Sequence, residues 1–206
     1  MQYPNDELRI REQSTVIITY EEYFEPMVLT KWQRKKRIAL AEELEDALFL
    51  LFLAWYYETD IIEAQKEFTD KYIAAVEKYD DVNLRDDFDE YITLLAAALY
   101  ESTLRNIDDP YFTSLDRAVY VAANEANTAL NKIEFGEAKA DGKTMKTWHT
   151  EQDLRVRDTH VPLDNKTIPI DDLFMVGGYP MAIPKDETHG APLREIANCR
   201  CSVTYS

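Results

Sequence analysis

The chain has 206 residues and carries 39 acidic against 23 basic side chains, a formal net charge of −16. A surface this acidic repels phosphate, which disfavours general nucleic-acid binding and binding to anionic membranes. Hydrophobic residues make up 46% of the sequence, enough for a buried core, so wholesale disorder is excluded.

The first element along the chain is expected to be an irregular arm over residues 1–20. Its polar start lacks the apolar section of a signal peptide. Within the arm, residues 13–20 (QSTVIITY) are β-prone and favour one edge strand.

A long helix is predicted next, capped by Thr30 and running from Lys31 to about Tyr57. It ends in 11 consecutive apolar or aromatic residues, 47–57, flanked by acidic side chains. A membrane-spanning helix needs about 20 such residues. The run therefore indicates a buried or partner-covered helix, in a chain that is soluble and cytoplasmic when made.

Three further helices are predicted from apolar residues at helical spacing. They cover residues 60–79, 87–105 and 114 to about 135, and the sequence Asp-Asp-Pro at 108–110 separates the last two. Thr113 and Asp116 resemble a capping pair for the last helix, and Gly136 and Gly142 mark its exit.

The character of the sequence changes from Lys143 onward, where five of the eight prolines lie. Residues 150–160 are expected to form one short helix, and residues 203–205 a terminal strand. The fold class predicted is therefore α+β and mostly helical. A helical N-terminal region, residues 1–112, precedes a small, irregular α+β C-terminal domain, residues 113–206.

Charge in the N-terminal half is arranged in blocks. A basic cluster at 31–37 precedes residues 42–109, which hold 19 acidic and 5 basic side chains. Opposite charges can orient a protein partner, and a helix that is apolar on every side needs a second cover. Two alternatives to partner binding stay open. The basic cluster could be a plain solvated helix face, and the apolar run could be completely buried within the monomer. The partner-binding residues predicted are Lys31, Arg34, Lys35, Lys36, Arg37, Phe49, Phe52, Trp55 and Tyr56.

Four segments of the second half carry a family resemblance. They are AVYVAANEANTALN (118–131), KTWHTEQDLRVRDTH (146–160), VPLDNKTIPID (161–171) and IANCRC (196–201). In this order they resemble the Mu F-like head-morphogenesis domain of phage minor capsid proteins, over about residues 115–206. Asn165 stands where that family commonly has glycine, and asparagine tolerates the same left-handed backbone.

The resemblance implies a bacteriophage minor head protein that acts in procapsid and head assembly. It implies association with the portal, a place inside the head of the virion, and assembly in the host cytoplasm. The partners implied are the portal protein and capsid or scaffold proteins. Contact with packaged DNA stays open, without sequence-specific recognition. No catalysis and no cofactor are expected. The alternatives are a small toxin-like enzyme (nuclease or ADP-ribosyltransferase) and a zinc-dependent interaction module.

Polar residues of the second half allow two interpretations. If 150–160 is helical, Asp153, Arg157 and His160 share a face. They then form either an active site, with His160 as general base and the arginines binding phosphate, or a structural network. The network is favoured because no nucleophile or second carboxylate is evident nearby. Glu125 is expected to pair with Arg155 or Arg157, and Trp148 to anchor the core. The predicted network is Glu125, Trp148, Asp153, Arg155, Arg157 and His160.

His160, His189, Cys199 and Cys201 are chemically suitable zinc ligands. However, the C-x-C spacing is narrower than a usual zinc knuckle, and 29 residues separate the histidines. No metal is therefore predicted, with Cys199 interpreted as a small buried hydrophobe. The two thiols are expected to be reduced and unlinked, because side chains two positions apart in an extended segment lie too far apart for a disulfide.

Overall fold

The computed structural model describes residues 18–80 and 85–206 and shows an α+β fold that is mostly helical, as predicted. The described residues form two compact units. The first contains the described residues up to Tyr23 together with Ile38–Ala123, and the second contains Phe24–Arg37 and Asn124–Ser206. The predicted boundary between residues 112 and 113 therefore lies inside a segment of the first unit, and that division stays a prediction.

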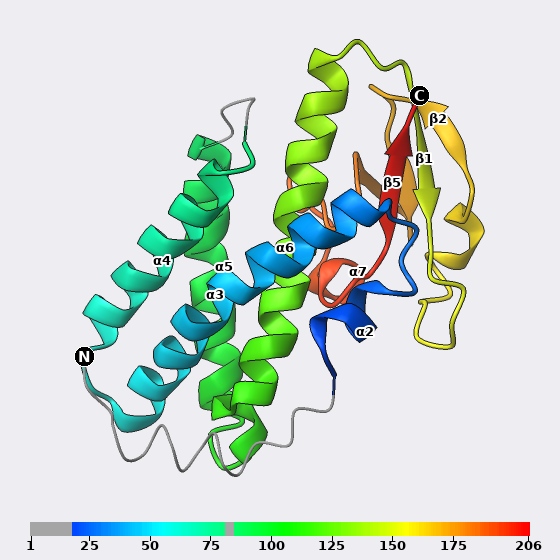
Figure 1. Cartoon of the computed structure of the whole chain (residues 1–206). Coiled ribbons are helices and arrows are strands. Elements are labelled where there is room, and N and C mark those ends of the chain that lie inside the picture. The colour runs from blue at the N-terminus through cyan, green and yellow to red at the C-terminus, as the bar shows by residue number, and fades with distance from the viewer. Residues whose placement is uncertain (1–17, 81–84) are drawn as a thin grey trace. The chain divides into compact units, whose positions relative to one another are not determined.

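Helix α2 (Tyr20–Phe24) and helix α3 (Lys31–Tyr57) begin the described chain (Figure 1). Residues 13–17 of the predicted edge strand lie outside the described residues. Helix α3 starts after Thr30, as predicted. The Gln33 N–H donates to Thr30 Oγ1 at 3.2 Å, and the Thr30 N–H donates to Gln33 Oε1 at 2.9 Å. This reciprocal capping box satisfies two backbone donors that a helix start leaves free.

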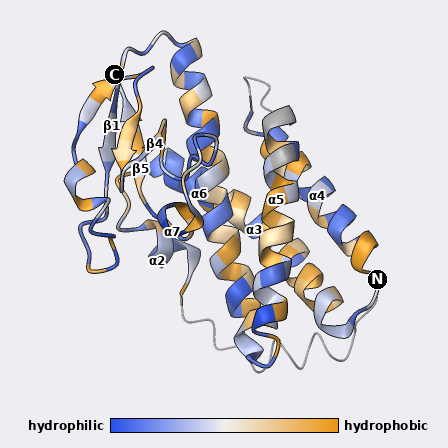
Figure 2. Ribbon diagram, turned by 180° about the vertical axis from the view of Figure 1, so that it is seen from behind, coloured by the Kyte–Doolittle hydropathy of each residue, from blue (hydrophilic) through white to orange (hydrophobic). Residues whose placement is uncertain are grey.

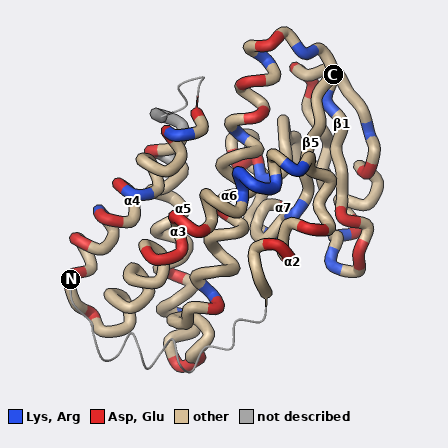
Figure 3. The backbone as a smooth tube through the Cα atoms, viewed as in Figure 1, with Lys and Arg blue, Asp and Glu red and all other residues tan. Residues whose placement is uncertain are grey.

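The first unit is built from helices. Helix α4 (Ile61–Glu77) and helix α5 (Arg85–Arg105) confirm the second and third predicted helices, and a 3₁₀ turn, η1 (Pro110–Thr113), follows them. Hydrophobic and hydrophilic residues alternate in bands along α4 (Figure 2). The buried rings of Phe68 and Tyr72 meet edge to face at 5.9 Å, and Tyr72 lies 6.3 Å from Phe88 of α5. Basic and acidic residues lie interspersed along α4 (Figure 3). The exposed side chains of Lys71 and Glu67 form an ion pair at 3.1 Å.

The apolar end of α3 is covered within the chain. Phe49, Phe52 and Trp55 are at most 1% exposed. The Trp55 ring lies 5.4 Å from that of Tyr100, and the Arg117 guanidinium lies 4.4 Å from the Phe52 ring centroid. The expectation that these three aromatic residues contact a partner is corrected, because neighbouring helices already bury them. Tyr56, the fourth, is 47% exposed. In the described part of the chain, no helix has the length and apolarity to cross a membrane.

Helix α6 (Leu115–Ala140) differs from its prediction at both ends. Its start is capped by Ser114, whose hydroxyl accepts from the Arg117 N–H at 3.2 Å, rather than by Thr113. The helix continues past Gly136. It ends where the Gly142 N–H donates to Lys139 O at 3.1 Å and the Lys143 N–H donates to Ala138 O at 3.0 Å. This is a Schellman motif, and Gly142 supplies its left-handed residue with φ of 71°.

Two small antiparallel sheets follow in the second unit. The strands are β1 (Met145–His149), β2 (Thr167–Pro169), β3 (Phe174–Val176), β4 (Tyr179–Met181) and β5 (Ser202–Tyr205). One sheet has the order β2-β1-β5, and the other pairs β3 with β4. Strand β5 confirms the predicted terminal strand. In β1, alternate side chains point to one buried face, which places Lys146 and Trp148 inside.

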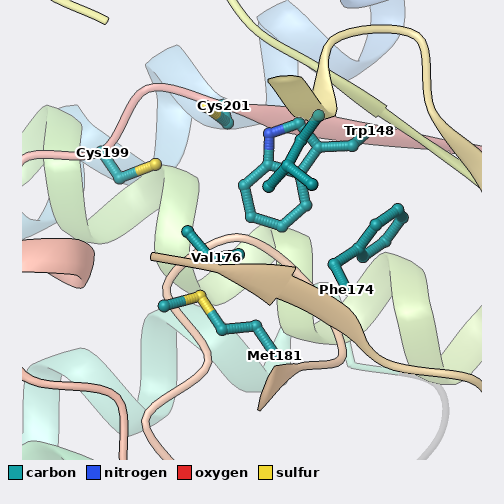
Figure 4. Close-up of a cluster of buried hydrophobic side chains, with 7 residues drawn as sticks. Trp148, Phe174, Val176, Met181, Cys199 and Cys201 are labelled. Atoms are coloured by element: carbon teal, nitrogen blue, oxygen red, sulfur yellow. The ribbon is translucent and has the colours of Figure 1, made fainter. Parts of the chain in front are cut away.

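Trp148 lies at the centre of the core of this unit. Its ring meets Phe174 edge to face at 5.1 Å, and Val176, Met181 and the two cysteines pack around it (Figure 4). Cys199 comes after the short helix α7 (Leu193–Ile196), and Cys201 directly precedes β5. The tryptophan thus packs in one buried cluster with both cysteines.

The predicted helix over residues 150–160 is wrong. The segment is a series of turns that leads into a 3₁₀ turn, η2 (Val161–Leu163). Gln152 has a left-handed backbone, with φ of 54°, and the Asp153 carboxylate accepts the Arg155 N–H at 2.9 Å. Such side-chain-to-backbone bonds compete with helix formation.

Candidate functional site

The candidate site is a buried cluster of His160, Cys199 and Cys201 in the second unit. The Sγ atoms of both cysteines lie 3.6 Å from His160 Nδ1. One ligand atom from each residue lies within 4.8 Å of those of the other two, and all three residues are buried. Both cysteines are free thiols.

Backbone geometry brings these residues together. His160 ends the run of turns, where its N–H donates to Arg157 O at 2.8 Å and its carbonyl accepts from Leu163 at 2.9 Å. The cysteines flank Arg200, and residues two apart in an extended segment face the same side. Both thiols therefore face the imidazole.

The two thiols influence one another's ionisation. The hydrogen bond from Cys201 and a further one from His160 hold the pKa of Cys199 below its usual value, although burial opposes this. The same contact with Cys199, together with burial, raises the pKa of Cys201. The pair therefore favours one thiolate facing one thiol, which is a suitable arrangement for binding a soft cation.

A carboxylate lies behind the imidazole. Glu195 Oε2 is 3.5 Å from His160 Nε2 and accepts the Thr159 hydroxyl at 2.7 Å. Gly177 leaves room for this carboxylate, because a Cβ at that position would lie 2.8 Å from Glu195 Oε1. The carboxylate thus lies beside Nε2, whereas the sulfurs lie beside Nδ1.

A small pocket opens onto the cluster. It is lined by Glu151, Arg155, Val156, Arg157, His160, Asn198, Cys199, Arg200 and Cys201. Arg200 forms ion pairs with Glu151 and, at 2.6 Å, with Asp153. Burial raises the pKa of Glu151 to about 7, although the charge of Arg200 acts in the opposite direction. The pocket is thus polar, charged and adjacent to the thiols.

The structure distributes the residues of the predicted network differently from the sequence expectation. Asp153 pairs with Arg200, and the Arg157 guanidinium donates to the Ala197 carbonyl. Glu125 is buried and accepts from the Asn124 amide at 3.2 Å. The shared helix face does not exist, since the segment is not helical. Nevertheless, Arg155, Arg157 and His160 line one pocket, and the network as a whole stays a prediction.

Of the four residues considered as zinc ligands, His160, Cys199 and Cys201 lie together. The fourth, His189, does not join them. His189 Nδ1 lies 2.9 Å from Asp186 Oδ2 and 2.9 Å from the Thr188 hydroxyl instead. The two cysteines are separated from His160 by about 40 positions. No local spacing in the sequence could therefore have indicated which histidine joins them.

Arg37 is a key residue that the sequence interpretation assigned wrongly. It is fully buried, and its guanidinium forms a two-pronged ion pair with Glu134 of α6, at 2.8 and 3.0 Å. It also donates to Asn127 Oδ1 and Asn131 Oδ1, both at 3.0 Å. A residue so enclosed does not serve as an exposed partner contact, which corrects the expectation for Arg37.

The rest of the basic cluster lies on or near the surface. Arg34 donates to the Phe24 carbonyl at 3.1 Å and is half-buried. Lys31 and Lys35 are exposed. The Lys36 ammonium lies 3.6 Å from the ring centroid of Trp32, a side chain that is 62% exposed.

Comparison with known protein families identifies the class of protein. The family described as Phage Mu protein F like protein matches residues 94–204, more than half of the chain. The chain belongs to this family, as the sequence motifs indicated. The match includes β1, the turns that lead to His160, and both cysteines. No curated protein and no solved structure matches the chain.

Proposed function

We propose that this protein is a minor head protein of a bacteriophage that acts in procapsid and head assembly, associated with the portal and located inside the head. Membership of the Phage Mu F like family is the observation that carries the proposal. The virion is its final location, and the portal with capsid or scaffold proteins are its partners. The protein has no catalysis of its own.

The burial of the candidate site supports a role without catalysis. His160 and Cys199 would be the natural base and nucleophile of an enzyme, yet they are 1% and 2% exposed. A nucleotide or nucleic acid would have to displace the surrounding turns to reach them. Their position favours holding the fold together over acting on a large substrate.

The start of α3 is the surface that best fits a docking role. We define the α3 patch as Val28, Lys31, Trp32 and Lys35, all of which are exposed. Lys31 and Lys35 are four positions apart and therefore neighbours on the helix surface; basic residues at this end of α3 are drawn blue in Figure 3. A tryptophan beside lysines combines an apolar anchor with positive charge, as is common at interface centres. The partner surface expected is acidic and contains an apolar pocket.

Co-expression with the portal protein of the same phage tests the docking role. The double charge reversal Lys31→Glu and Lys35→Glu should weaken co-purification with the portal, because it opposes the electrostatic steering. The matched control is Lys66→Glu with Lys71→Glu on α4, which makes the same change of net charge on exposed lysines. Equal capture of both variants would place docking elsewhere on the chain.

Particle incorporation tests the location. Heads made in the presence of the protein should contain it and protect it from added protease until the shell is opened. Removal of the gene should leave heads that are absent or abnormal. Normal heads that lack the protein entirely would contradict a role in assembly.

A further inference from the structure

We infer that His160, Cys199 and Cys201 bind a zinc ion in the second unit. The inference reverses the expectation that the chain binds no metal. It rests on the positions of the ligand atoms and of the groups around them, and it does not depend on the assembly role.

The two separations between sulfur and nitrogen are those of a tetrahedral zinc site. With Zn–S bonds of about 2.3 Å and Zn–N bonds of about 2.0–2.1 Å, a tetrahedral angle separates sulfur from nitrogen by about 3.6 Å. Both cysteine sulfurs lie 3.6 Å from His160 Nδ1. These two distances fit a single ion bonded to all three atoms, which lie within 4.8 Å of one another.

Hydrogen bonding alone accounts for only part of this arrangement. A neutral imidazole nitrogen makes one hydrogen bond in its ring plane, yet two buried sulfurs converge on Nδ1. Each sulfur is a weak hydrogen-bonding group, so the gain from such contacts is small. A zinc ion between the three would satisfy both thiolates and the nitrogen at once, and its charge would neutralise the thiolates.

The surrounding groups also match a zinc site. A histidine that binds zinc usually donates its other ring N–H to a carboxylate, which fixes the tautomer. Glu195 lies in this position, 3.5 Å from Nε2. On the other side, the indole nitrogen of Trp148 faces Cys201 (Figure 4). The outer partners thus leave Nδ1 and the sulfurs directed at one point.

His160, Cys199 and Cys201 all line the pocket that Glu151 and Arg200 also line. A water molecule from this pocket would complete the tetrahedron, as in zinc sites with three protein ligands. The C-x-C spacing, too narrow for a usual knuckle, suits this geometry because both thiols face one side of an extended segment. An ion at this point would join the turns at 150–160 to the segment that precedes β5, which Arg200 already ties to Glu151 and Asp153.

Metal analysis of the full chain tests the inference. Protein purified under reducing conditions and equilibrated with zinc should retain one zinc per chain after dialysis, measured by mass spectrometry of the element. Cys199→Ser and Cys201→Ser should each lose it, while the control His189→Gln, which alters the histidine outside the cluster, should retain it. Zinc lost from the control, or retained in both cysteine variants, would overturn the assignment.

A second measurement covers the case in which the cysteine variants fail to fold. Cobalt(II) added to the unaltered protein should produce the intense near-ultraviolet absorption of thiolate–cobalt bonds, and zinc should abolish it by displacement. The thiols should react slowly with a thiol reagent when zinc is bound and faster after a chelator is added. A folded protein that gives no cobalt absorption and no effect of chelator would refute the site.

Discussion

The guanidinium of Arg37 makes four hydrogen bonds to side chains of α6 and none of its surface is exposed. Removing one partner of a buried pair leaves the other charge without compensation. We expect Arg37→Ala to lower the free energy of unfolding by about 3–5 kcal/mol, measured by urea denaturation. Arg37→Lys should restore only part of this loss, because an ammonium cannot bind both oxygens of Glu134 as a fork.

The neighbouring Lys35 provides the matched control. It belongs to the same basic run but is exposed, so Lys35→Ala should change the free energy of unfolding by no more than about 0.5 kcal/mol. If both alanine variants lost the same stability, the buried ion pair would have no special role.

Lys146 is a second buried cation, and its environment predicts a pH effect. Its ammonium lies 4.9 Å from the Phe135 ring centroid and 5.4 Å from that of Phe174, with no hydrogen-bond partner among the described residues. Burial lowers the pKa of Lys146 to about 8 from its usual 10.5. The folded chain therefore binds fewer protons than the unfolded chain between these values, and its stability rises with pH in that window.

Substitution by methionine removes this titration and should show the effect directly. We expect Lys146→Met to be more stable than the unaltered protein at pH 7, and its advantage to shrink as the pH rises from 8 to 10.5. Urea denaturation at several pH values measures this difference. Lys166→Met, which changes an exposed lysine, serves as control. A Lys146→Met advantage that is constant with pH would show that Lys146 does not titrate as inferred.

Single residues also show where sequence reasoning reaches its limit. Trp148 was expected in the core on its type alone, and it lies there. Arg37 was expected at the surface because it ends a basic run, but its partners lie 90 or more positions away in the sequence. The convergence of His160 with the cysteines has the same origin. Contacts between residues so far apart in the sequence depend on how whole helices and strands pack. A local sequence pattern does not encode this packing.

At the scale of elements, the start of α3 offers a direct test of a sequence-derived feature. Thr30 and Gln33 form the capping box. Thr30→Ala should lower the free energy of unfolding by about 0.5–2 kcal/mol, since it leaves the Gln33 backbone N–H without its acceptor. Thr30→Ser keeps the hydroxyl and should restore stability in the same thermal or urea measurement. A serine variant as unstable as the alanine variant would implicate the methyl group instead.

Helices were the elements best predicted from the sequence, because their apolar spacing and caps are local signals. Gly136 did not end α6, since the cost of a glycine inside a helix is only about 1 kcal/mol, and Ile133 and Ala138 on either side are buried. The prediction failed over residues 150–160. There Asp153 and Asp164 each accept a backbone N–H and stabilise turns. Short strands such as β2 and β3 have too few residues for an alternating pattern to be recognised.

At the scale of the whole molecule, the second unit is assembled from two distant parts of the chain, Phe24–Arg37 and Asn124–Ser206. The earlier part contributes more than Arg37. The Ser202 hydroxyl at the start of β5 donates to the Val28 carbonyl at 3.2 Å, and Phe24 and Met27 are buried. A fragment that begins at residue 113 therefore contains the family motifs but lacks part of its own core.

We accordingly expect a fragment of residues 113–206 to fold poorly alone, without a cooperative unfolding transition. Loss of the Arg37 contacts leaves the Glu134 carboxylate without its buried partner, and loss of Phe24 and Met27 exposes apolar surface that they cover. A chain that joins residues 24–37 to residues 113–206 through a flexible linker should recover cooperative unfolding, whereas the same chain with Arg37→Ala should recover less. Circular dichroism during thermal unfolding distinguishes these cases. If the short fragment unfolded as cooperatively as the joined chain, residues 24–37 would be dispensable, and the motif-bearing region would be an independent domain with the boundary that the sequence suggested.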